Sequence, residues 1–286
     1  MRIIFITFAA CYLKRSRERM EKKRILYVSQ EIFPYLPESE MSEISRYLPQ
    51  GIQERGREIR TFMPRYGCVN ERRNQLHEVI RLSGMNLVIN DTDHPLIIKV
   101  ASIQTARMQV YFIDNEDYFQ RKCVLTDPEG NEFPDNDERA VFFARGVLET
   151  VIKLRWAPDI IHCHGWLTSL IPLYIKKYYY HNPLFKHSKL VYSVYNDDFV
   201  NTLNPKFCEK LLLDGIEKED VKVIHDPTYV NVNKLAINFS DGVIKATESI
   251  NTEVEDYIKL SGKLNIGYQP KETYIDAYNA FYDQIF

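Results

Sequence analysis

The fold is decided by a stretch that begins with Ile25-Leu26-Tyr27-Val28, a short run of β-forming residues bounded by charges. Residues 40–55 follow with a helical pattern, because apolar side chains recur three and four positions apart at Met41, Ile44, Leu48 and Ile52. Residues 59–63 are predicted to form the next strand, which Pro64 ends. Strand, helix and strand within about forty residues make a βαβ unit, so we predict an α/β fold around a parallel sheet.

The rest of the chain extends this sheet. Short apolar runs at residues 87–89, 96–100 and 110–113, with a turn over 90–95, predict an inserted β-meander. The clearest helix begins at Asp135 or Asn136 and carries an apolar stripe at Phe143, Val147, Val151 and Leu154. Further strands are expected at 160–161, 189–194 and 242–244, and helices at 166–179, 208–213, 232–239 and 248–260. The tail from Gly262 is expected to pack only loosely.

Composition narrows the class of protein. The chain has 286 residues, 45% of them apolar and 27% charged, which is ordinary for a globular domain. A formal net charge of −2 argues against a nucleic-acid partner. The five cysteines are scattered and never form a CxxC pair, which argues against a disulfide framework or a structural zinc site. We therefore expect a protein of the reducing cytoplasm.

The first residues need a separate interpretation. An apolar run over residues 3–13 is too short to cross a bilayer, and a basic cluster follows it. We interpret residues 1–19 as a leader or a mis-assigned start, with Met20 as the alternative first residue. Residues 20–286 are then a single domain, and we expect no membrane association; a membrane anchor at residues 3–13 is the alternative.

The residues best suited to chemistry follow a buried strand. In Pro158-Asp159-Ile160-Ile161-His162-Cys163-His164-Gly165-Trp166, the apolar pair leads into two histidines. Ligands bind at the carboxyl ends of strands in open α/β sheets. His162 and His164 alternate along the strand and so point to the same face. Either they are hydrogen-bonded residues that hold a loop, or one of them is a polar contact or general acid/base in a pocket. Trp166 is either the wall of that pocket or a core residue.

Other chemistries find no support. A metal ion would need a third ligand beside the two histidines, and no further His or Cys pair offers one, so we predict no metal site. The chain contains no P-loop, no GxGxxG and no GxSxG, and we expect no cofactor. Asp135 and Asn136 are interpreted as helix caps or as groups that bind sugar hydroxyls, since a carboxylate accepts two such bonds.

Several of these pieces, in this order, resemble the N-terminal domain of bacterial glycogen synthases and plant starch synthases. The likeness covers roughly residues 22–260, and its motifs are specific only in combination. The matching pieces are residues 25–31, Leu48-Pro49 through Gly56 into Pro64-Arg65-Tyr66, Asp135-Asn136-Asp137-Glu138-Arg139, Pro158 to Trp166, and Ser193-Val194-Tyr195-Asn196.

The resemblance implies a function and a site. Members of this family transfer glucose from ADP-glucose to an α-1,4-glucan. The implied fold is the Rossmann-like N-terminal half of a two-domain GT-B glycosyltransferase, whose active site lies between the halves. His164 is implied as the catalytic residue that lines the donor-glucose pocket. The resemblance implies Asp135, Asn136 and Asn196 as substrate-binding residues, and the place of His162 and Trp166 at the end of the strand adds these two to the expected set.

The chain also departs from the family pattern. The family has a Lys-x-Gly-Gly loop after its first strand, which meets the nucleotide phosphates. Residues 35–42 hold neither lysine nor glycine here, and their two glutamates would repel a diphosphate. Gly165 stands where the family has aspartate, and Leu167 and Tyr195 where it has histidine. The chain ends at Phe286, so the second domain is expected to be absent.

These observations leave three hypotheses. The first is a glycogen- or starch-synthase-type glucosyltransferase that is not self-sufficient and needs a partner chain to supply the second domain. The second is a non-catalytic module that binds glucan, docks on a synthase or regulates it. The third is an independent sugar- or nucleotide-binding protein. Without the groups that hold a leaving diphosphate, most of the catalytic stabilisation would be lost in the isolated chain.

Overall fold

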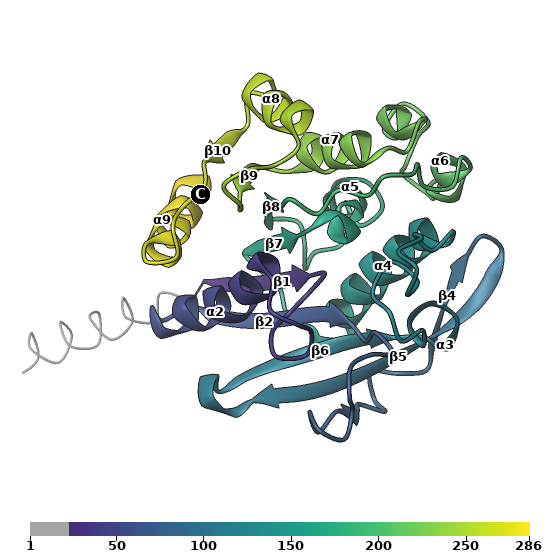
Figure 1. Ribbon diagram of the computed structural model, residues 1–286, viewed down its shortest axis with the longest axis horizontal. Coiled ribbons are helices and arrows are strands. Elements are labelled where there is room, and N and C mark those ends of the chain that lie inside the picture. Colours follow the sequence, from purple (N-terminus) through teal and green to yellow (C-terminus); the bar gives the residue numbers. More distant parts are fainter. Residues whose placement is uncertain (1–22) are drawn as a thin grey trace, which may run out of the picture.

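One mixed β-sheet runs through the molecule. The computed structural model describes residues 23–286, so the predicted leader over 1–19 lies outside the described residues. The strands follow the order β10-β9-β8-β7-β1-β2-β6-β5-β3, and β4 pairs with β5 (Figure 1). Their bounds are β1 Arg24–Ser29, β2 Glu58–Pro64, β3 His77–Glu78, β4 Met85–Ile89, β5 Thr92–Ile103, β6 Met108–Asp114, β7 Ile160–His164, β8 Lys189–Val194, β9 Gly242–Lys245 and β10 Leu264–Ile266.

Helices connect and cover these strands. Their bounds are α2 Glu40–Glu54, α3 Glu116–Phe119, α4 Asn136–Leu154, α5 Leu170–Lys176, α6 Phe207–Lys210, α7 Tyr229–Phe239, α8 Thr252–Leu260 and α9 Tyr274–Ile285. Among residues 23–286, no helix is long and apolar enough to cross a membrane. The predicted helix over 166–179 divides into a 3₁₀ turn (Trp166–Thr168) and α5, and the one over 208–213 shortens to α6.

The pairing of the strands confirms the predicted fold class. β1 lies between β2 and β7 and is parallel to both, and β8, β9 and β10 continue the parallel part. The predicted meander is also present, because β5 pairs antiparallel with β4 and with β6. The central registers align Ser29 with His164 and His164 with Ser193, so three strands end side by side.

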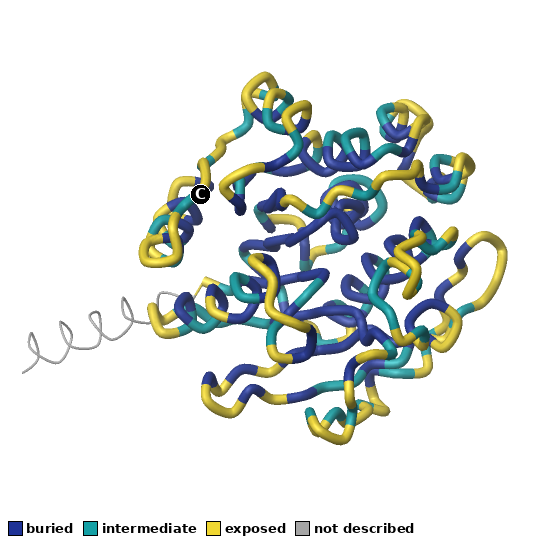
Figure 2. The backbone as a smooth tube through the Cα atoms, viewed as in Figure 1, coloured by how far each residue is buried: buried dark blue, intermediate teal, exposed yellow. Residues whose placement is uncertain are grey.

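Each face of the sheet has its own helical layer (Figure 1). Leu26 and Val28 of β1 belong to the larger core, which α4, α5 and α7 cover. Ile25 and Tyr27 alternate with them and belong to the second core, where α2 and α9 pack. The buried tube in Figure 2 follows the central strands, and the exposed segments are mostly loops and outer helix faces.

The C-terminal segment corrects one expectation. The tail from Gly262 was expected to pack loosely, but it forms β10 and then α9, which is fixed to the sheet. The side chains of Tyr278 and Tyr282 are fully buried, and Arg57 forms an ion pair with Asp283 at 2.8 Å. The expectation was wrong because tyrosines and phenylalanines at helical spacing build an apolar stripe that the polar composition of the tail conceals.

Candidate functional site

The candidate site lies at the carboxyl edge of β1, β7 and β8. His164 is the last residue of β7, and its register partners Ser29 and Ser193 stand on either side. The loop after β1 leads into α2, and the loop after β8 contains Asn196 and Asp197. The structure thus brings the histidine pair, Trp166 and Asn196 to one edge of the sheet, where ligands bind in open α/β folds.

His162 is a fully buried residue whose two ring nitrogens are both engaged. Its Nδ1 lies 2.7 Å from the hydroxyl of Tyr282, and its Nε2 lies 2.7 Å from the hydroxyl of Ser193. Burial, together with neighbouring His164, lowers the pKa of His162 well below its usual value, so the ring is neutral. With both nitrogens occupied, His162 links α9 and β8 to β7.

His164 differs from His162 in having one free ring nitrogen. Its Nδ1 lies 2.7 Å from the hydroxyl of Tyr195, but its Nε2 has no hydrogen-bond partner among residues 23–286. The two imidazole rings are 3.9 Å apart between centroids. Burial lowers the pKa of His164 to about 3, so its side chain is neutral near pH 7. A neutral imidazole with an open nitrogen can donate or accept one hydrogen bond to a ligand.

Asp197 is a site residue that the sequence analysis missed. Its carboxylate accepts hydrogen bonds from the backbone N–H of Trp166 at 3.1 Å and from the Tyr229 hydroxyl at 2.8 Å. Trp166 is buried and packs edge-on against Phe199, so it is mainly a core residue. Asn196, by contrast, is exposed. The sequence signal for Asp197 was its place directly after the motif Ser193-Val194-Tyr195-Asn196. Its hydrogen-bond partners Trp166 and Tyr229 lie more than thirty positions away in the sequence, so the contacts could not be predicted.

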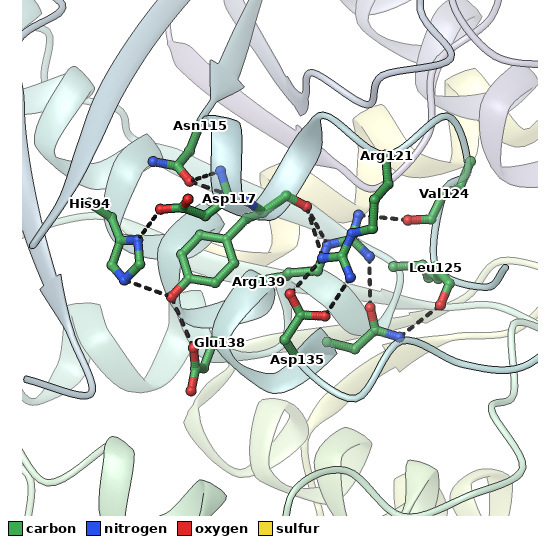
Figure 3. A network of polar contacts seen from close by, with 11 residues as sticks. His94, Asn115, Asp117, Arg121, Val124, Leu125, Asp135, Glu138 and Arg139 are labelled. Atoms are coloured by element: carbon green, nitrogen blue, oxygen red, sulfur yellow. Dashed lines mark hydrogen bonds and ion pairs between the residues drawn. The ribbon is translucent and has the colours of Figure 1, made fainter. Parts of the chain in front are cut away.

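Asp135 and Asn136 are engaged in contacts within the protein (Figure 3). Asp135 occupies the N-cap position of α4, yet its side chain makes no capping bond. It forms a two-pronged ion pair with Arg121 at 2.8 and 2.5 Å. Asn136 donates to the carbonyl of Leu125 at 2.9 Å. The prediction that a side chain of this pair caps the helix is therefore wrong for Asp135, because Arg121 provides a charged partner.

Arg139 completes this motif and ties the preceding loop to α4. Its buried guanidinium donates to the carbonyls of Tyr118 and Val124 and to the side-chain oxygen of Asn136, at 2.7 to 2.8 Å (Figure 3). Burial lowers its pKa to about 10, which still leaves it charged near pH 7. The polar groups that the sequence assigned to a sugar thus hold residues 118–136 in place.

The loop between β1 and α2 differs from the phosphate-binding loop that the resemblance in sequence implies. The N-terminus of α2 is closed by a capping box. The side chain of Ser39 accepts from the backbone N–H of Ser42 at 3.0 Å, and the side chain of Ser42 accepts from the backbone N–H of Ser39 at 2.8 Å. Glu40 and Glu43 occupy the first helical turn. A helix N-terminus that binds phosphate offers free N–H groups and positive potential. The capped and acidic start of α2 offers neither to a diphosphate.

The pKa of Asp197 predicts that the stability of the fold depends on pH. Burial raises the pKa of its carboxyl from 3.8 to about 7. Between these values the folded chain binds a proton that the unfolded chain releases, so the contribution of Asp197 to stability falls as pH rises, by at most ~1.4 kcal/mol per pH unit. Above pH 7 this contribution is constant. In urea unfolding measured from pH 4.5 to 8, the stability of Asp197→Asn relative to wild type should increase as the pH rises to about 7 and should then stay constant. A stability difference independent of pH would contradict this.

The arrangement of the sheet, the helices and the candidate site defines a class of fold. A mixed sheet with helices on both faces, and a histidine and a carboxylate at the carboxyl edge of its central strands, places the chain among the α/β proteins that bind ligands at that edge. Within residues 23–286, no group of three or more His, Cys, Asp or Glu side chains is arranged to hold a metal ion.

The chain belongs to the starch synthase catalytic domain family, whose profile matches residues 24–265. It is 37% identical to a glycogen synthase of Chlorobium luteolum over 79% of this chain and 45% of that relative. It is 40% identical to a glycogen synthase of Chlorobium phaeobacteroides over 66% of this chain and 39% of that relative. The chain therefore spans less than half the length of these curated relatives.

A solved structure agrees on the fold. The catalytic domain of starch synthase IV from Arabidopsis thaliana, bound to ADP and acarbose, superposes with a TM-score of 0.70 at 17% identity. The superposition covers 87% of this chain and 51% of that one. The resemblance inferred from the sequence motifs is thereby confirmed, as is the GT-B-type fold that it implied.

Proposed function

We propose that this chain supplies the sugar-binding half of a glycogen- or starch-synthase-type glucosyltransferase, which transfers glucose from ADP-glucose to an α-1,4-glucan. The observation that carries the proposal is the open Nε2 of His164 at the carboxyl edge, within a chain that belongs to this family. In this proposal His164 contacts the donor sugar and Asn196 lies at the same edge. Trp166, His162, Asp135 and Asn136 shape the site rather than touch the ligand.

The acidic loop argues that this half does not act alone. Glu40 and Glu43 stand at the capped start of α2, where they would raise the energy of a bound diphosphate. The groups that stabilise the leaving diphosphate then come from a second domain. We place the reaction in the reducing cytoplasm, because the four cysteines among residues 23–286 are all free.

The proposal is tested by calorimetry with ADP-glucose and maltose, together with an assay of glucose transfer to glycogen. The purified chain should bind maltose but should not approach ordinary turnover rates of about 1–10³ s⁻¹. The His164→Ala variant should bind about tenfold more weakly, since loss of a buried hydrogen-bond partner costs roughly 1–3 kcal/mol.

The exposed His181 provides the matched control, and His181→Ala should bind maltose as the wild type does. Equal affinities of the wild type and His164→Ala would contradict the role of this histidine. Transfer at ordinary rates by the chain alone would contradict the need for a second domain. No detectable binding of either ligand would count against a transferase function.

A further inference from the structure

A hollow of about 150 Å³ lies between α2 and the segment that enters α9. Its walls include Glu40 and Tyr47 of α2, Ala246 directly after β9, and Tyr268 and Tyr274. The last two residues lie beyond residues 24–265, so a segment outside the family match builds one wall. Pockets for drug-sized ligands begin at about 300 Å³, so this hollow suits one small ring better than a nucleotide sugar.

The floor of the hollow separates it from His164. Met41, Tyr195 and Ala246 form a small apolar cluster, and each side chain is at most 5% exposed. Ala246 also lines the hollow, while the Tyr195 hydroxyl lies 2.7 Å from Nδ1 of His164. One layer of side chains thus divides the hollow from the histidine.

Two of the buried polar atoms without a hydrogen-bond partner among residues 23–286 belong to the histidine pair and the helix beside it. One is Nε2 of His164 and the other is the hydroxyl of Tyr278, on α9. The rings of Tyr278 and His162 are 6.2 Å apart, so α9 brings this hydroxyl to the histidine pair. Buried polar groups are almost always hydrogen-bonded, so open ones on His164 and on the helix that packs against the histidine pair indicate a place where a polar ligand enters.

Met41 is the movable part of the floor. Its methyl group lies so close to Gly165 that a Cβ atom on that glycine would be only 2.8 Å away. Methionine is unbranched and has three rotatable bonds, so its side chain can move without a shift of the backbone. Rotation of this side chain away from Gly165 would open a path from the hollow to the edge of β7.

The walls indicate the chemistry of the ligand. Glu40 and Glu43 are acceptors for hydroxyl groups and repel phosphate, and Lys271 already pairs with Glu43 at 3.0 Å. Tyr47 and Tyr268 are 40% and 38% exposed, so each presents part of a flat apolar ring. Acceptors between partly exposed aromatic rings suit an uncharged ring that carries several hydroxyl groups.

We propose that this hollow admits one uncharged sugar unit to His164 and that Met41 is the gate between them. The inference rests on the proposed function, since it names the ligand class and the route for the same histidine. It differs from the family's phosphate-binding route, because the ligand enters between α2 and α9 and carries no phosphate.

The gate is tested by the rate at which diethyl pyrocarbonate modifies His164, followed by peptide mass spectrometry. This reagent attacks a free imidazole nitrogen, so His162, with both nitrogens engaged, is the internal control. Met41→Ala should speed modification by about tenfold, the factor that corresponds to ~1.4 kcal/mol in an opening equilibrium. Met41→Phe should slow it, and Met85→Ala, on the outer strand β4, should leave it unchanged.

Maltose should protect His164 in the Met41→Ala variant, and inorganic phosphate should not. Tyr47→Ala should weaken that protection, whereas Tyr180→Ala, with its exposed ring on a different surface, should not. Equal modification rates of His164 in wild type, Met41→Ala and Met41→Phe would overturn the role of Met41 as a gate. This holds also if His164→Ala weakens sugar binding, because that result tests the proposed function and not the gate. Faster modification without protection by maltose would overturn the ligand class and leave the gate intact.

Discussion

Replacing Arg139 by alanine is expected to lower the free energy of unfolding by about 3–5 kcal/mol, because the change leaves buried acceptors unpaired and a cavity behind. The side chain is fully buried, and its guanidinium bonds the carbonyls of Tyr118 and Val124 as well as Asn136. It also lies within 6 Å of the rings of Tyr66, Phe119 and Phe133. Urea unfolding followed by circular dichroism measures the effect.

Two further variants sharpen this prediction. Arg139→Lys keeps the charge but cannot form the planar fork of hydrogen bonds, so it should still lose much of the stability. Arg72→Ala removes an exposed arginine and should change stability by less than about 0.5 kcal/mol. If Arg139→Ala unfolded at the same urea concentration as Arg72→Ala, the hydrogen bonds of Arg139 to residues 118–136 would not contribute to stability.

Replacing Phe281 by alanine is the second change with a large expected effect, a loss of about 3–5 kcal/mol. Phe281 is buried in the core that α9 shares with α2 and the sheet. Its ring lies against Gly242 of β9, where an added Cβ atom would be 2.9 Å away. A cavity at this point would weaken the attachment of α9, and with it the Tyr282 bond to His162. Thermal and urea unfolding measure the loss.

The control lies at the end of the same helix. Phe286 is half-exposed, and its ring contacts the ammonium of Lys23, so Phe286→Ala should cost no more than about 0.5 to 1 kcal/mol. Hydrogen exchange of the α9 amides should accelerate in Phe281→Ala and remain near wild type in Phe286→Ala. Unchanged stability of Phe281→Ala would mean that α9 is not part of the cooperative fold.

The elements that the sequence predicted well are those with strong local periodicity. The strand-helix-strand pattern of residues 25–63, the long helix now seen as α4 and the strand over 189–194 all appear in the structure. The meander was predicted as well, although its turn is shorter than expected because β5 already begins at Thr92. The C-terminal helix α9 escaped prediction, because polar residues separate its tyrosines along the sequence, although the rings of Tyr274, Tyr278 and Tyr282 are buried together.

The sequence predicted where the two histidines lie in the sheet, but not the contacts that each of them makes. The alternation of His162 and His164 along one strand is a local property, and it located both at the carboxyl edge. The role of each histidine depends on residues far along the chain. His162 bonds Tyr282, which lies 120 residues away, and His164 bonds Tyr195, which lies 31 residues away.

The sequence by itself therefore determined the α/β fold class, the family, the edge at which the site lies and the acidic character of the loop before α2. The fold class, the edge and the acidic loop follow from periodicity, strand polarity and charge, which act over a few residues, and the family follows from the resemblance of the motifs in combination. Only the tertiary structure decided that His162 is engaged, that Nε2 of His164 is open and that α9 closes one face of the sheet. Those outcomes depend on hydrogen bonds and burial between segments that meet only when the chain is folded.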